Sequence, residues 1–311
     1  MRRSSFIQLD VFTSVPFGGN QLAVFPRADE LNEQEMQTIA RELNFSETTF
    51  VLDATEQKAH CRVRIFTPQR ELPFAGHPVV GTTFALARAG RLHEMGSPIF
   101  LQLGIGTIAV DVLYEERRPS FVWMHQPVPA FESWRGDQAQ LASALSLSAG
   151  ELDAELPIER GSAGVAFLYV PVRSKEALAH ASPTPRLREA MGEARGEFSG
   201  HPAVYVFTPS ATSAAGTGVP EFRARMFAPK MGIVEDAATG SAAGPLGAYL
   251  VRHQRVRGDG DGEARILIEQ GIEMGRPSRI SVVVIGEPGK IREVRVGGEA
   301  VTVAEGEMFL P

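Results

Sequence analysis

Three titratable side chains stand where the sequence changes from one kind of element to another. His77 follows Gly76 at a predicted helix start, and Asp236 comes shortly before Gly240 at a second one. Glu47 lies where a predicted helix gives way to a strand. Helix N-termini carry unpaired N–H groups and partial positive charge, and glycine permits close approach to the backbone. Two such helix starts facing one cleft would bind a carboxylate or stabilise an enolate-like intermediate.

The chemistry that suits these side chains is proton transfer to or from carbon. Such a step needs a base whose pKa is raised towards neutrality, which burial of a carboxylate achieves. Moving a proton between two carbons requires one group that acts first as base and then as acid. Each residue also has a structural alternative. Glu47 is then a surface carboxylate at a helix end, His77 caps the helix that begins at Pro78, and Asp236 caps a loop.

The elements that must position these residues mix strands and short helices along the whole chain. A helix over 33–43 places Met36, Ile39 and Ala40 on one apolar face, and Asn32 with Glu35 resembles a capping box. Further helices are predicted over 78–88, 137–145, 185–195 and 241–252. Strands are predicted over 6–12, 22–25, 48–53, 60–66, 98–103, 107–113, 120–125, 165–172, 203–208, 222–227, 265–269, 279–285, 292–296 and 299–303.

The sequence contains an internal repeat. Arg62-Val-Arg-Ile-Phe-Thr-Pro68 reappears as Arg223-Ala-Arg-Met-Phe-Ala-Pro229, and each copy leads through a short loop to a glycine at a helix start. Chance similarity between two amphipathic strands is the simpler alternative. We favour two domains of one ancestral fold that face each other across a cleft. Gln126-Pro-Val-Pro129 is the candidate linker, so the domains are expected at 1–127 and 128–311, with the last strands free to cross back.

Composition excludes several functional classes. The 311 residues carry a net charge of -6, which gives no reason to expect nucleic acid or an anionic membrane as a partner. The single cysteine, Cys61, excludes a disulfide framework and any mechanism that needs two thiols in one chain. Histidines show no metal-site spacing, and Gly104 to Ala109 lacks the helix that a dinucleotide fingerprint requires. With no membrane span or signal peptide expected, we predict a cytoplasmic protein.

Four short motifs resemble the PhzF family, the phenazine-biosynthesis isomerase-like proteins, which share a fold with diaminopimelate epimerase and proline racemase. Separately each motif is short, but together, and in the family's order, they are specific. Ala237 departs from the pattern, since many members carry proline there. The motifs are Asp10-Val-Phe-Thr13 running to Phe17-Gly-Gly-Asn20, Asn44-Phe-Ser-Glu-Thr-Thr-Phe50, Phe74-Ala-Gly-His-Pro78 and Gly232-Ile-Val-Glu-Asp-Ala-Ala-Thr-Gly-Ser-Ala242.

The resemblance implies an α+β fold of two pseudo-symmetric domains. Each would be a curled, mostly antiparallel, barrel-like sheet around a central helix, with the active site between them. It further implies a homodimer that uses no metal and no organic cofactor. Glu47 would shuttle a proton between carbon atoms of a small cyclic acid, without the two opposed cysteines of the epimerases.

The supporting site residues also follow from the resemblance together with the reasoning above. His77 is expected to bind the substrate or donate a proton, and Asp236 to orient His77 or a polar substrate group. The carboxylate of the substrate would be held by backbone N–H groups near Gly76 and Gly240 and by the hydroxyl of Ser241.

Three hypotheses for function remain open at this point. The first is a cofactor-independent isomerase of a small carboxylic acid, with catalysis by Glu47. The second is an epimerase or tautomerase of an amino acid derivative, and the third is a metabolite-binding protein without catalysis. The sequence does not identify the substrate, and it does not establish a link to phenazine biosynthesis.

Overall fold

The computed structural model describes residues 2–92, 97–194, 196–199, 203–210, 218–229 and 233–310. Gly232, the first residue of the fourth motif, lies outside these ranges. The chain divides into two compact units, which we describe one at a time. Unit 1 comprises Met1–His125 and Val296–Pro311, and unit 2 comprises Gln126–Arg295.

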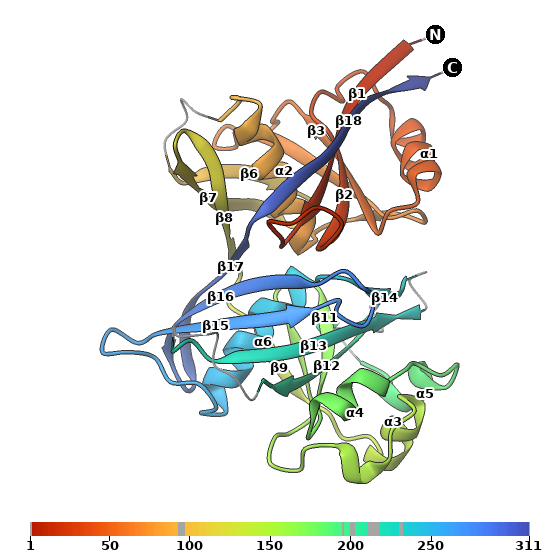
Figure 1. The fold of residues 1–311 in the computed structure, drawn as a ribbon, viewed down its shortest axis with the longest axis vertical. Coiled ribbons are helices and arrows are strands. Elements are labelled where there is room, and N and C mark those ends of the chain that lie inside the picture. Colours follow the sequence, from red (N-terminus) through yellow and green to blue (C-terminus); the bar gives the residue numbers. More distant parts are fainter. Residues whose placement is uncertain are drawn as a thin grey trace. The chain divides into compact units, whose positions relative to one another are not determined.

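The described residues of unit 1 form two helices and a mostly antiparallel sheet (Figure 1). Its elements are β1 (Arg2–Val11), β2 (Asn20–Phe25), α1 (Glu33–Leu43), β3 (Glu47–Leu52), β4 (Cys61–Phe66), β5 (Glu71–Leu72), α2 (Gly76–Arg88), β6 (Ile99–Leu103), β7 (Gly106–Glu115), β8 (Arg118–Gln126) and β18 (Ala300–Leu310).

The strand order of unit 1 is β18-β1-β2-β3-β4-β6-β7-β8, and β5 pairs with the end of β4. Two pairs are parallel, β2 with β3 and β4 with β6. Parallel neighbours need a crossover connection, and α1 and α2 lie in these connections. The starts of β2 and β3 therefore lie at the same edge of the sheet.

Helix α2 forms the centre of unit 1. All its residues except Arg88 are buried, and it packs against β1, β2, β3, β7 and β18. A helix that is apolar on every side belongs inside a core. Helix α1 instead buries one face, with Met36, Ile39 and Ala40 in a cluster that includes Phe50 and Phe66.

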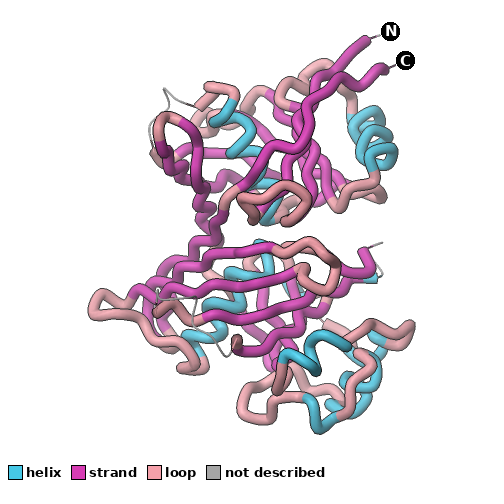
Figure 2. The backbone as a smooth tube through the Cα atoms, in the orientation of Figure 1, coloured by secondary structure: helices cyan, strands magenta, loops and turns pink. Residues whose placement is uncertain are grey.

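Unit 2 repeats this plan and adds helices (Figures 1 and 2). Its elements are β9 (Ala130–Ser133), α3 (Gln138–Ala144), β10 (Glu159–Ser162), β11 (Ala166–Pro171), α4 (Lys175–His180), α5 (Leu187–Met191), β12 (Val204–Pro209), β13 (Glu221–Ala228), β14 (Ile233–Asp236), α6 (Gly240–Arg252), β15 (Glu263–Gln270) and β16 (Ser278–Glu287), followed by β17 (Lys290–Gly298), which runs on into the last part of unit 1.

The strand order of unit 2 is β9-β10-β11-β12-β13-β15-β16, with β14 on the end of β13. Its parallel pairs, β11 with β12 and β13 with β15, stand where those of unit 1 stand. Helix α6 is buried from Gly240 to Val251 and packs against β10, β11, β15 and β16. It therefore occupies the place in unit 2 that α2 occupies in unit 1.

The α+β fold predicted from the sequence is confirmed, with differences at the ends of elements. Helix α1 has the predicted bounds and the predicted capping box. Helix α2 begins at Gly76, two residues before the predicted start, so His77 lies in its first turn. Strands β5, β9, β10 and β14 and helix α4 were not predicted, since each is six residues or shorter and shows little periodicity. Among the described residues, no helix is long and apolar enough to cross a membrane.

Candidate active site

The start of α2 brings together two of the residues that the sequence pointed to. Glu47 is the first residue of β3, and His77 is the second residue of α2. His77 Nε2 lies 3.5 Å from Glu47 Oε2, and both side chains are buried. This distance is long for a hydrogen bond, but catalytic contacts often shorten only when a ligand binds.

Two polar residues hold the other side of the imidazole. Ser46 Oγ donates to Asn20 Oδ1 at 3.0 Å, so the amide nitrogen of Asn20 is the atom that faces His77. Asn20 Nδ2 lies 3.1 Å from His77 Nδ1. Asn20 therefore contacts the Nδ1 side of the ring, and Nε2 is the ring nitrogen that faces Glu47.

His77 is neutral at ordinary pH. Complete burial of the ring lowers the pKa of His77 from 6.5 to about 3, and a hydrogen bond to the backbone of Gln21 opposes this shift. The Glu47–His77 contact is therefore between a carboxyl group and a neutral imidazole. His77 is suited to donating a hydrogen bond and not to acting as a cationic acid.

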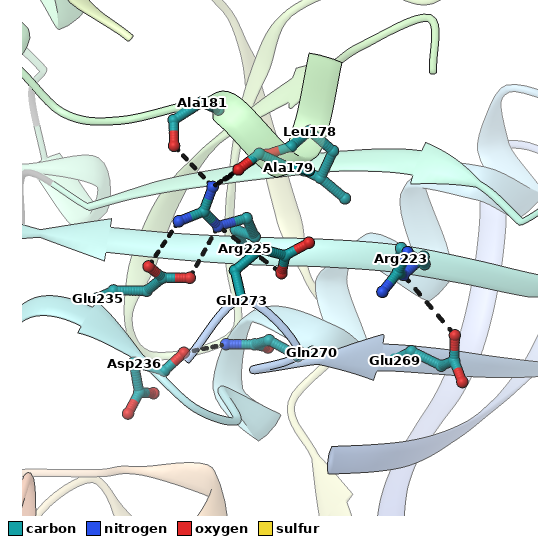
Figure 3. Close-up of polar contacts among 10 residues, drawn as sticks. All are labelled: Leu178, Ala179, Ala181, Arg223, Arg225, Glu235, Asp236, Glu269, Gln270 and Glu273. Atoms are coloured by element: carbon teal, nitrogen blue, oxygen red, sulfur yellow. Dashed lines mark hydrogen bonds and ion pairs between the residues drawn. The ribbon is translucent and has the colours of Figure 1, made fainter. Parts of the chain in front are cut away.

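Gly76, also predicted, is the first residue of α2, and unit 2 places the other three predicted residues around the start of α6. Asp236 ends β14, and Gly240 and Ser241 are the first two residues of α6. Asp236 Oδ2 accepts a hydrogen bond from Thr239 Oγ1 at 2.6 Å. The side chain of Gln270, at the end of β15, donates to the backbone oxygen of Asp236 at 2.8 Å (Figure 3).

Both helix starts lack a side-chain cap. The N-cap residues are Ala75 before α2 and Thr239 before α6, and neither side chain bonds to a helix N–H. First-turn N–H groups need an outside partner, and the helix dipole makes these positions favourable for an anion. Each start is thus suited to a carboxylate, whether from a ligand or from the protein.

Cys61 takes no part in either group. It is buried in β4, and burial raises the pKa of its thiol to about 11. Such a thiol is a poor nucleophile and a poor acid/base group at neutral pH. Within the described ranges, no group of three or more His, Cys, Asp or Glu side chains could hold a metal ion.

The sequence assigns no role to four polar residues of this region. Asn20, Thr239 and Gln270 contact predicted residues, and Ser46 contacts Asn20. Three of the four lie inside the quoted motifs, which was the available signal. Gln270 gave no signal, because its contact with Asp236 arises only when β15 pairs with β13.

Comparisons with known proteins show the family of the chain. The profile of the phenazine biosynthesis-like protein family, PhzC-PhzF, matches residues 9–306. A trans-2,3-dihydro-3-hydroxyanthranilate isomerase of Pseudomonas fluorescens is 37% identical over 306 residues, or 98% of this chain and 99% of that protein. The chain therefore belongs to the phenazine biosynthesis-like family, and it is an isomerase.

Solved structures show the same fold. The phenazine biosynthesis protein of the PhzF family from Bacillus anthracis superposes with a TM-score of 0.86 at 30% identity, covering 100% of both chains. A probable proline racemase from Agrobacterium radiobacter gives a TM-score of 0.65 at 14% identity, covering 99% of this chain and 93% of that one. At 14% identity, the likeness to the probable racemase shows a shared fold alone.

Proposed function

We propose that the enzyme moves a proton between carbon atoms of a small cyclic carboxylic acid, using Glu47 as the acid/base group and no cofactor. The observation that carries this proposal is the buried contact of Glu47 with His77 at the uncapped start of α2. A carboxylate beside a helix N-terminus and a neutral hydrogen-bond donor can take a proton from carbon and return it elsewhere.

The steps assign one task to each group. Glu47 removes a proton from one carbon as charge spreads over the substrate, and it then returns the proton to another carbon. The N–H group of His77 and the N–H groups at Gly76 stabilise that charge. Asp236, with Gly240 and Ser241 at the start of α6, is proposed to bind polar groups of the substrate.

Relatives supply the compound with which to test this. Proteins 36–37% identical over nearly the whole chain are named trans-2,3-dihydro-3-hydroxyanthranilate isomerases. That compound has the carboxylate and the ring that the proposal requires, so we propose it as the first substrate to assay. That both helix starts act on one substrate molecule stays a prediction from the repeat, as do the homodimer and the cytoplasmic location.

The decisive variant is Glu47→Gln, which keeps the shape of the side chain and removes the base. We expect kcat to fall by about 10²–10⁴-fold, the range for loss of a general acid/base. The proton that Glu47 carries can exchange with solvent before it is returned. In D₂O, wild-type enzyme should therefore place deuterium on the carbon that receives the proton, and the variant should not. Near-normal turnover by Glu47→Gln would exclude the proposed role.

The chain offers a matched control. Glu159 is also buried and lies 3.0 Å from the ring nitrogen of His253, but this pair stands at the far end of α6 and Arg252 lies 3.8 Å from the same carboxylate. Glu159→Gln should lower stability and leave kcat within about threefold of wild type. Equal losses of kcat in both variants would point to a general effect of disturbing a buried Glu–His pair.

A further inference from the structure

The side-chain amide of Gln270 has every hydrogen-bonding position filled. Its Nε2 donates to the backbone oxygen of Asp236 at 2.8 Å and to Thr239 Oγ1 at 2.9 Å. Its Oε1 accepts from the Tyr205 hydroxyl at 2.9 Å and from the Thr239 N–H at 3.1 Å. A carboxamide offers two donor and two acceptor sites, so this group is completely satisfied in one orientation. Gln270 is buried and holds three segments together.

The fixed amide also fixes the hydroxyl of Thr239. Because Thr239 Oγ1 accepts a hydrogen from Gln270, its own hydrogen is directed elsewhere, and Asp236 Oδ2 lies 2.6 Å away. A hydroxyl that donates to a carboxylate makes a short, charge-assisted hydrogen bond. The order of donation is therefore Gln270 to Thr239, and Thr239 to Asp236.

Helix capping does not explain this arrangement. Threonine is a good N-cap residue, and Thr239 occupies the N-cap position of α6, yet its hydroxyl bonds to no helix N–H. The hydroxyl instead faces Asp236. The hydroxyl of Thr239 thus bonds to the carboxylate of Asp236 and does not cap a helix N–H group.

The charged neighbours of Asp236 lie on separate faces. Adjacent strand residues point to opposite sides, and Figure 3 shows Glu235 turned to Arg225 while the Asp236 carboxyl group points away from them. From β12, the Tyr205 phenol lies on the Gln270 side, and burial followed by the charge of Asp236 raises the pKa of Tyr205 far above 10. Tyr205 therefore remains a neutral donor.

We infer that Thr239 and Gln270 are positioning residues that hold the Asp236 carboxylate in one orientation and favour its ionised form. The inference rests on the proposed function in so far as Asp236 is taken to bind substrate. It adds Thr239, which contacts the carboxylate of Asp236, and Gln270, which contacts Thr239 and the Asp236 backbone; neither needs to contact the substrate.

The test compares Thr239→Val with Thr239→Ser. Valine matches the shape of threonine but has no hydroxyl, whereas serine keeps the donor. With trans-2,3-dihydro-3-hydroxyanthranilate, Thr239→Val should lower kcat/KM about tenfold and move the acidic limb of the pH–rate profile up by about one pH unit, because a donor to the charged form is lost. Thr239→Ser should restore both to near wild type.

The control is Thr83→Val in α2, since Thr83 is equally buried and its hydroxyl donates only to Val79 of its own helix. It should leave the profile unchanged. If Thr239→Val does not fold, Thr239→Ala removes the same donor with less change in packing. A folded variant with an unchanged acidic limb would overturn the inference.

A second readout separates this inference from the proposed function. The carboxyl carbon of Asp236, labelled with ¹³C and assigned with Asp236→Asn, can be titrated without any substrate. Its midpoint should rise in Thr239→Val and not in Thr239→Ser. If wild-type enzyme neither converts nor exchanges the compound while this midpoint still shifts, the proposed function fails and the positioning role stands. An unmoved midpoint contradicts the positioning role alone.

Discussion

Strands β4 and β13 carry equivalent arginines, Arg64 and Arg225. Each arginine bonds to a glutamate on the short strand that follows. Arg64 Nε and Nη2 donate to Glu71 at 2.8 and 2.5 Å, and Arg225 Nε and Nη2 donate to Glu235 at 2.8 and 2.7 Å. Each guanidinium also stacks over the phenylalanine two residues further on, at 5.1 and 4.9 Å. In each unit this pair fixes the segment that leads into the central helix.

The residue after the glutamate differs between the units. Leu72 follows Glu71 and pairs with Ile65, while Asp236 follows Glu235 and pairs with Met226. The two positions are equivalent in the sheet, but one carries an apolar side chain and the other an acid. The scaffold was kept in both units, and the acid stands only in unit 2.

The acid of unit 1, Glu47, has no acidic counterpart in unit 2. Phe66 of β4 pairs with Thr48, and the equivalent Phe227 pairs with Val204, so Glu47 corresponds to Ala203. The second residue of the central helix is His77 in unit 1 and a serine in unit 2. Each unit therefore carries one of the two acids named in the proposal, at different positions of the same frame.

The largest effect is expected when the acid of unit 2, Asp236, is removed. Asp236→Asn keeps the size of the side chain and removes its charge, so kcat/KM should fall by about 10³-fold, or about 4 kcal/mol of transition-state stabilisation. Leu72→Asn changes the equivalent residue of unit 1 and should cost stability with little change in rate. Steady-state kinetics and thermal unfolding of both variants provide the comparison. Retention of more than a third of wild-type kcat/KM by Asp236→Asn would show that the acid of unit 2 is dispensable.

The second comparison concerns the helix starts. Burial lowers the pKa of His77 from 6.5 to about 3, so between these values the unfolded chain binds a proton that the folded protein does not. The free energy of unfolding should therefore fall as the pH is lowered through this window, by up to about 1.4 kcal/mol per pH unit from this group. His77→Asn should remove the contribution of this group to the pH dependence of the unfolding free energy, which amounts to about 3 kcal/mol between pH 6.5 and 4.

The matched variant for His77→Asn is Ser241→Ala, because Ser241 is the second residue of α6 as His77 is of α2. Serine does not titrate, so this change should alter stability by the same amount at every pH. Urea titrations at intervals of half a pH unit measure both. Parallel pH dependence in wild type and His77→Asn would mean that folding does not shift the pKa of His77.

Much of the frame could be predicted from the sequence because its signals are local. Helix α1 is specified by Asn32, Glu35 and an apolar face, and the repeat was visible in the residues of β4 and β13. Helix α2 starts earlier than predicted, since Ala75 gives no capping signal. Strand β14 was missed because four residues with one buried side chain show no period.

The contacts within the site depend on pairing between distant segments. Asn20 meets His77 because the parallel β2 and β3 both start at the edge of the sheet where α2 begins. Gln270 meets Asp236 only through the pairing of β15 with β13. A single polar residue at a strand end has no periodic pattern, so spacing along the chain does not indicate its partner.

The smallest expected difference lies between the two arginines themselves. Beyond its glutamate, Arg225 Nη1 donates to three backbone oxygens at the end of α4, at 2.7–3.1 Å. Arg64 instead adds Glu33, which is 73% exposed, and a weak contact with Met36 Sδ at 4.0 Å. The three backbone oxygens at Arg225 belong to Leu178, Ala179 and Ala181. Lysine cannot reproduce this set of donors. Arg225→Lys should therefore cost about 3 kcal/mol of unfolding free energy, as expected for breaking a buried network.

Arg64→Lys should cost only about 1 kcal/mol, since its two glutamate partners are exposed to solvent and the ion pairs are screened. Urea titrations at low and high salt distinguish the two, because added salt should reduce the Arg64 loss and leave the Arg225 loss nearly unchanged. Equal losses would mean that the two pairs are equivalent in energy as well as in geometry. A larger loss at Arg225 would show that unit 2, which carries Asp236 next to this pair, holds its β14 strand more firmly than unit 1 holds β5.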